Sequence, residues 1–147
     1  MVDPSVSHYK NSSLGISFTY PKIITASTTS AEIILHHQVT FDHHDYCDFK
    51  GDGTGTLPYL TDLHVKMSVV HKNLVDAMKA GSPYIPAENF VNGDVVPSPG
   101  FIDVYTVGDL KGFSIFEGAE GCGHTIYYLR VSENKTLVVT NDLVTVF

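Results

Sequence analysis

Three consecutive stretches decide the fold class of this chain: TIYYLRV at residues 125–131, SENK at 132–135 and TLVVT at 136–140. The first and third are rich in β-branched and aromatic residues, which fit the pleated surface of a strand. The polar stretch between them has the composition of a turn. These residues therefore predict two antiparallel strands, the last pair of a β-meander.

The pattern on the N-terminal side of this hairpin extends the sheet. We predict further strands at residues 15–20, 31–41, 62–69, 101–107 and 110–117, from the two-residue alternation of apolar and polar side chains and from the turns between them. Asn92-Gly93 is typical of a type I′ hairpin turn. Asn73 as an N-cap and Gly81 as a stop predict a helix over residues 73–79. We expect an α+β fold, a mainly antiparallel sheet of about six to eight strands with one or two short helices.

Length and charge limit the classes of function. The 147 residues, of which 43% are hydrophobic, suit a single domain over residues 1–147 with a flexible lead at 1–8. The net charge of −7 and the scattered basic residues would repel a phosphate backbone, so we expect no nucleic-acid partner. The chain has no long apolar run and no signal-peptide pattern at its start. Membrane attachment would therefore need a lipid anchor or signal segment absent from this chain.

Residues 36–48, HHQVTFDHHDYCD, hold four of the eight histidines and three aspartates. Imidazole and carboxylate groups are preferred zinc ligands. The strand period puts His37 on an apolar face and His36 on a polar one. His64 would join the cluster if its strand paired beside the first. The pattern predicts a site for zinc or another divalent transition metal, with the candidate ligands His36, His37, His43, His44, Asp45, His64 and His124.

The role of such a metal is open at this level. If one coordination position were left to water, the ion would lower the pKa of that water and generate a nucleophile for ester or phosphoester cleavage. Asp42 and Asp45 are then the candidate catalytic carboxylates. A fully ligated site would be structural. Alternatively, the histidines are solvated side chains plus one buried histidine, without a metal.

The two cysteines, Cys47 and Cys122, lie far apart and outside any CxxC pattern. They could form one long-range disulfide, remain free thiols, or take part in ligation or catalysis. A nucleophilic Cys122 with His124 as its base is conceivable in the glycine-rich loop at 117–124. A disulfide would remove that nucleophile and bring His124 close to the Asp45 region.

Short motifs along the chain carry a family resemblance. They are YKN at 9–11, GISFTYP at 15–21, LTD at 60–62, NL at 73–74, EGCG at 120–123, YY at 127–128 and KTLVV at 135–139. With them the chain resembles a family of uncharacterised exported or lipoprotein domains of candidate-phyla bacteria, over roughly residues 8–140. The order of its elements is similar to the Mog1/PsbP-like fold.

The resemblance implies an extracytoplasmic location at the cell envelope and permits a disulfide, but it implies no activity. Family members tend to continue into another helical segment after the final strand. A truncated C-terminus is therefore expected, with the exposed edge covered by a partner chain or in a homo-oligomer.

Two functions from different classes follow. The first is a zinc-binding exported domain with metal-dependent hydrolase activity on esters or phosphoesters. The alternative is a non-catalytic extracytoplasmic binding module, whose sheet faces a small-molecule or envelope partner and whose histidines form a pH-sensitive patch. Protonating all eight histidines would move the formal charge from −7 to +1. The density of the histidine cluster favours the first.

Overall fold

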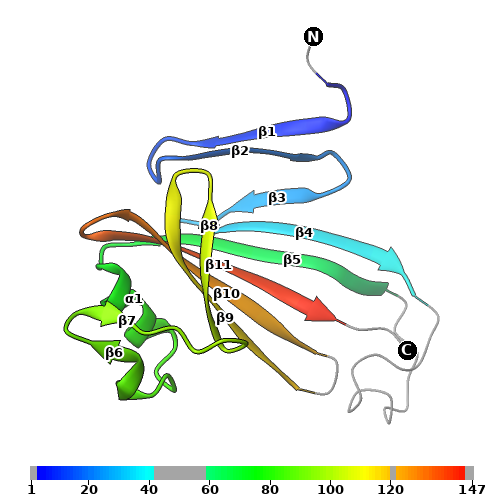
Figure 1. The fold of residues 1–147 in the computed structure, drawn as a ribbon. Coiled ribbons are helices and arrows are strands. Elements are labelled where there is room, and N and C mark those ends of the chain that lie inside the picture. The colour runs from blue at the N-terminus through cyan, green and yellow to red at the C-terminus, as the bar shows by residue number, and fades with distance from the viewer. Residues whose placement is uncertain (1–2, 42–58, 120–121, 145–147) are drawn as a thin grey trace.

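The computed structural model describes residues 3–41, 59–119 and 122–144 (Figure 1). In these residues the chain forms β1 (Val6–Asn11), β2 (Ile16–Pro21), β3 (Thr25–Thr28), β4 (Ile33–Thr40), β5 (Tyr59–Val70), α1 (Leu74–Gly81), the 3-10 helix η1 (Ala87–Asn89), β6 (Phe90–Val91), β7 (Asp94–Val95), β8 (Ile102–Val107), β9 (Leu110–Ala119), β10 (Cys122–Ser132) and β11 (Lys135–Val144).

Seven strands form one sheet in the order β3-β4-β5-β11-β10-β9-β8, and every neighbouring pair is antiparallel. The hairpins β1-β2 and β6-β7 are separate two-stranded ribbons. The last strand, β11, lies between β5 and β10, so it joins the two halves of the chain (Figure 1). The expected α+β class with a mainly antiparallel sheet is confirmed.

Several element boundaries differ from the sequence-based expectation. The segment 117–124 was expected to be a glycine-rich loop, but β9 continues to Ala119 and β10 begins at Cys122. Glycine does not end these strands because they pair with each other as far as Cys122 and Ala119. Strands β1 and β3 were not predicted, and β1 includes the last residues of the expected lead.

Helix α1 forms where the sequence indicates it and packs on one face of the sheet. The Asn73 side chain accepts a hydrogen bond from the Asp76 backbone N–H at 2.8 Å, which caps the first turn. The buried side chains Leu74, Ala77 and Met78 form one stripe at helical spacing. That stripe packs against a buried cluster from three strands, comprising Ile102, Ile115, Ile126 and Tyr128. We call this side of the sheet the helix-side face.

The face of the sheet opposite α1 borders a cavity that it shares with the β1-β2 turn. Val69 and Leu137 are partners in the β5-β11 register, next to Val70 and Val138, which contact the helix-side core. Alternation therefore directs Val69 and Leu137 away from α1. They line a cavity of about 220 Å³ together with Leu14 and Gly15 of the β1-β2 turn. In the described ranges, α1 falls well short of the length and apolarity that crossing a bilayer requires.

Helix α1 is anchored to the sheet by a buried hydrogen bond. The Tyr128 side chain is 1% exposed, and its hydroxyl lies 2.8 Å from Ser82 Oγ, just beyond the end of the helix. Gly81 lies against the same ring, so a Cβ at this position would overlap the tyrosine hydroxyl. Burial raises the pKa of the Tyr128 phenol, while its hydrogen bond to Ser82 acts in the opposite sense.

We predict that Tyr128→Phe lowers the free energy of unfolding by about 1 to 3 kcal/mol near pH 7, because it leaves Ser82 Oγ buried without its partner. The raised pKa of Tyr128 means that the folded state favours the neutral phenol. The stability that the neutral phenol contributes to the wild type is fully present below the unfolded pKa of about 10 and is lost as the pH rises above that value. In urea unfolding, the difference in the free energy of unfolding between wild type and variant should be smaller at alkaline pH than at neutral pH. Tyr105→Phe, at a 36% exposed ring, is the control. A difference that grows with pH would contradict the assignment.

Candidate functional site

Five ionisable side chains form a line across five neighbouring strands. The register pairs His36 with His64, and it pairs His124 with Asp142 on one side and with Glu117 on the other. The β5-β11 register ends at Asn141↔Val65, so Asp142 follows beside His64. We call these residues the histidine–carboxylate row: His36 on β4, His64 on β5, Asp142 on β11, His124 on β10 and Glu117 on β9.

The row lies on the helix-side face. In β10, His124 is two residues from Ile126 and four from Tyr128, and both of these side chains belong to the core under α1. Side chains two apart in a strand share a face, so His124 and its cross-strand partners lie on that face too. The row is therefore a polar continuation of the apolar surface that packs against the helix.

Two of the three histidines of the row, His64 and His124, each lie beside one carboxylate. His64 Nδ1 lies 2.9 Å from Asp142 Oδ2, and His124 Nε2 lies 2.5 Å from Glu117 Oε2. These four side chains are between 28% and 44% exposed. The rings of His36 and His64 meet edge to face with their centroids 6.2 Å apart. Half-exposed pairs of this kind contribute little to stability, about 0 to 1 kcal/mol each.

One atom of the row is not satisfied by its neighbours. His64 Nδ1 is buried, and although Asp142 Oδ2 is close, the two atoms are not aligned for a hydrogen bond. Within the described residues this nitrogen has no hydrogen-bond partner. A buried imidazole nitrogen beside a carboxylate can take a proton or bind a cation without breaking an existing hydrogen bond.

A further histidine–carboxylate pair lies outside the row, at a β-bulge. The β4-β5 register shifts between His37 and Gln38, which leaves Asp62 as the additional residue of β5. His37 Nδ1 and Asp62 Oδ1 are 2.6 Å apart. Because His37 neighbours His36 in the strand, its side chain points to the other face.

The structure brings together only some of the predicted metal ligands. His36, His64 and His124 share the row, as expected for His64 if its strand paired beside the first. His37 lies on the opposite face. Among residues 3–41, 59–119 and 122–144, no group of three His, Cys, Asp or Glu side chains is arranged to hold a metal ion. The remaining candidates, Asp42, His43, His44 and Asp45, lie outside the described residues.

Only one of the two cysteines lies among the described residues. Cys47 lies outside the described residues, so its disulfide with Cys122 stays a prediction. Cys122 itself, at the start of β10, does not carry a free thiol. This disfavours the alternative in which Cys122 acts as a nucleophile with His124 as its base, since a nucleophile must be a thiolate. His124 instead contacts Glu117.

Sequence reasoning missed the carboxylates of the row. Glu117 was placed at the end of a predicted strand, where a glycine-rich loop was expected to begin, and Asp142 lies beyond the last predicted strand, which ended at residue 140. The signal available was the continued alternation through residues 136–142, which puts Asp142 on the face of Val138. Nothing local indicates that this face meets His64, since that contact depends on the pairing of β11 with β5.

Comparisons with known proteins add no identification. No family model, no curated protein and no solved structure matches this chain.

We predict that His64 and Asp142 are energetically coupled when the imidazole is charged. A double-mutant cycle with His64→Gln and Asp142→Asn should give a coupling of about 0.2 to 1 kcal/mol near pH 5.5 and less near pH 8, because the attraction needs the protonated ring. Urea unfolding of the four proteins at both pH values measures it. The same cycle with His8→Gln, at an exposed histidine on β1, is the control and should give no coupling. Coupling that is equal at both pH values would rule out a charge-dependent pair.

Proposed function

We propose that this protein is a non-catalytic binding module whose histidine–carboxylate row is a charge patch that responds to pH. The observation that carries the proposal is the matching of His64 and His124 with one carboxylate each, on one face of a continuous sheet. Such pairs do not provide the converging nucleophile, base and electrophile that catalysis needs. They do provide a surface whose charge depends on the state of its imidazoles.

The charge of the patch follows from its members. Two carboxylates and the fixed charge of Lys66, two residues from His64 on β5, sum to −1 when the three imidazoles are neutral. With His36, His64 and His124 all protonated the sum is +2. The imidazole is the side chain whose ordinary pKa places this change between about pH 5 and pH 8. A partner that prefers one sign would therefore bind in one pH range and dissociate in the other.

The finer fold and the location are part of this proposal. The order of strands around one helix supports the similarity to the Mog1/PsbP-like fold, and the family resemblance supports an extracytoplasmic domain at the envelope with a disulfide between Cys47 and Cys122. The absence of a free thiol at Cys122 is consistent with that disulfide. An envelope location is also one in which external pH reaches the patch directly.

We predict that the local electrostatic potential over the row changes sign between about pH 8 and pH 5. NMR relaxation enhancement by a cationic and an anionic nitroxide measures this potential at individual protons. For protons near β5, β10 and β11, the cationic probe should cause the larger relaxation enhancement at the higher pH. The anionic probe should cause the larger enhancement at the lower pH. A variant with His36→Gln, His64→Gln and His124→Gln should lose the change.

The matched control carries His8→Gln and His71→Gln, two exposed histidines outside the row. It should keep the sign change, since the row is intact. If the sign near the row is the same at both pH values in the folded wild type, the proposed patch does not exist.

Zinc binding is the second candidate, and two features of the row favour it. Imidazole, carboxylate and imidazole follow one another on three adjacent strands, and Nδ1 of His64 is buried without a hydrogen bond to any described residue. Cross-strand neighbours have Cβ atoms about 4.5 to 5.5 Å apart, so side-chain rotation could bring His64, Asp142 and His124 to one ion. A metal-bound water would then supply hydrolysis of esters or phosphoesters.

The metal content of the purified, untagged protein tests this candidate. Zinc binding requires about one metal ion per chain by inductively coupled plasma mass spectrometry, lost in His64→Gln/His124→Gln and kept in His8→Gln/His71→Gln. Hydrolysis of a chromogenic ester or phosphoester should then be abolished by a chelator. Trace metal together with no thermal shift on adding zinc would eliminate the metal site and the hydrolase activity that depends on it.

A further inference from the structure

The helix-side face has a second polar group at the end opposite the histidine–carboxylate row. Arg130 of β10 and Lys111 of β9 are direct partners in the register, and both are exposed. Arg130 is two residues from Tyr128, and Lys111 is two residues from Phe113, so both cations share the face that packs against α1. Two like charges directly opposite each other in a sheet are destabilising.

Neither cation forms an ion pair with a carboxylate in the part of the chain that the structure describes, although Asp109 lines the same cavity. The ion pairs found there join histidines to acids at the other end of the sheet and at the bulge, and none includes Lys111 or Arg130. The cross-strand neighbours on the outer sides are also uncharged, namely Thr106 beside Lys111 and Thr136 beside Arg130. The two cations are therefore direct cross-strand neighbours without an ion-pair partner among the described residues, in a protein of net charge −7.

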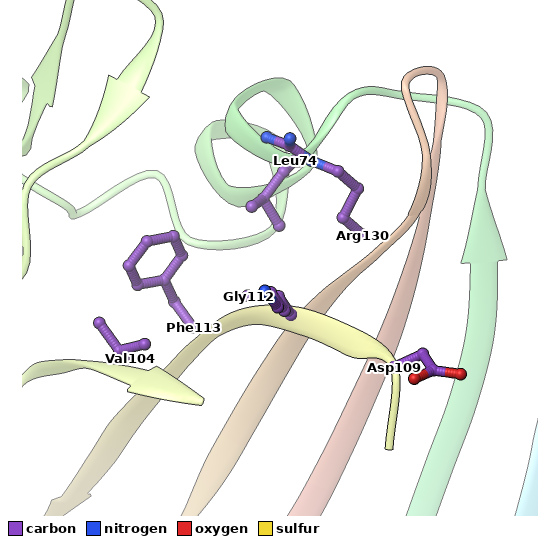
Figure 2. Close-up of a pocket in the computed structure, with 7 residues that line it drawn as sticks. Leu74, Val104, Asp109, Gly112, Phe113 and Arg130 are labelled. Atoms are coloured by element: carbon purple, nitrogen blue, oxygen red, sulfur yellow. The ribbon is translucent and has the colours of Figure 1, made fainter. Parts of the chain in front are cut away.

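The two cations open onto a groove with apolar walls. A cavity of about 350 Å³ is lined by Leu74 from the start of α1, Val104 of the edge strand β8 and Phe113 of β9, together with both cations. Figure 2 shows the guanidinium of Arg130 next to Leu74, the ring of Phe113 across the hollow and the carboxylate of Asp109 at the far end. The Val104 side chain is 65% exposed, so this wall is open to solvent.

Arg130 is shared by the adjoining hollows. It also lines two smaller cavities, of about 250 and 220 Å³, between α1 and the β6-β7 turn at Gly93. Arg130 and Leu74 therefore line three adjoining cavities beside the start of α1, and the two smaller ones also include the acidic residues Asp76 and Asp94. A planar guanidinium and a lysine that line the same cavity provide donors for the oxygens of a carboxylate or a phosphate monoester. The volume is at the lower end of the range for small-molecule sites.

We propose that this groove binds a small amphipathic anion, with its carboxylate or phosphate held between Lys111 and Arg130 and its apolar part against Leu74, Val104 and Phe113. The bound anion would offset the repulsion between the two cations, which the free protein has to tolerate. This proposal does not depend on the histidine–carboxylate row, none of whose residues lines the groove.

The test uses octanoate and octyl phosphate as probes, with octanol, acetate and octylamine as controls for each half of the ligand. NMR titration of the full chain should show that both anions shift the amide signals of residues 74–76, 111–113 and 130, while the controls do not. Lys111→Gln and Arg130→Gln should each weaken octanoate binding about tenfold or more, as expected for loss of a charge-assisted hydrogen bond. Lys22→Gln, at an exposed lysine outside the groove, should leave binding unchanged.

A stability measurement separates a binding role from a structural one. Without ligand, Lys111→Gln and Arg130→Gln should unfold at the same or higher urea concentration than wild type, because each removes the like-charge contact. Equal shifts with octanol and octanoate, unchanged affinity in both variants, or no shift with millimolar octanoate or octyl phosphate would each overturn the proposal. Stronger binding of one anion than the other supports it and identifies the preferred headgroup.

Discussion

The register of β10 against its two neighbours is the constraint on which both the core and the polar sites depend. Ile126 and Tyr128 of this strand face α1, and their burial fixes which side chains of β10 point to that face. His124 and Arg130 lie an even number of residues from Ile126 and Tyr128, so they point to the same face. One precedes these two residues in the strand and the other follows them. A shift of one residue would turn all four away from the helix and expose Tyr128, so hydrophobic burial sets the positions of the charged groups as well.

The helix-side face consequently has two ends with different electrostatic character. At one end imidazoles contact carboxylates, and at the other two cations are cross-strand neighbours that form no ion pair among the described residues. His124 and Arg130 are six residues apart in one strand, which corresponds to roughly 20 Å, about twice the screening length at physiological salt. The two ends therefore act independently of each other, although one strand carries a residue of each.

The energetic roles of the polar contacts differ with burial. The Tyr128–Ser82 hydrogen bond is enclosed between α1 and the sheet, where losing one partner leaves an unsatisfied group. The pairs of the histidine–carboxylate row are half exposed, and water screens them. The fold thus depends on the apolar cluster under α1 and on the buried hydrogen bond, while the row can change its charge with little effect on stability.

Local signals in the sequence were sufficient to predict most helices and strands, but they were insufficient to predict which residues meet in the histidine–carboxylate row. The Asn73 cap, the Asn92-Gly93 turn and the alternation in residues 125–140 act over a few residues, so they could be read without knowing the fold. Strands β1 and β3 were missed, because their apolar alternation is weak and their pairing partners stabilise them. The role of Glu117 was missed because the glycines after it suggested that a loop begins there, whereas pairing with β10 continues the strand to Ala119.

The sequence by itself determined the antiparallel α+β class, helix α1 and its buried stripe, and the alternation of faces in the strands that it predicted. These follow from the strand and helix periods and from capping, which are properties of neighbouring residues. Only the tertiary structure decided that His64 meets Asp142 and that Lys111 opposes Arg130. Such contacts depend on strand order and register, and burial of Ile126 and Tyr128 under α1 selects these among the many pairings that the same alternation allows.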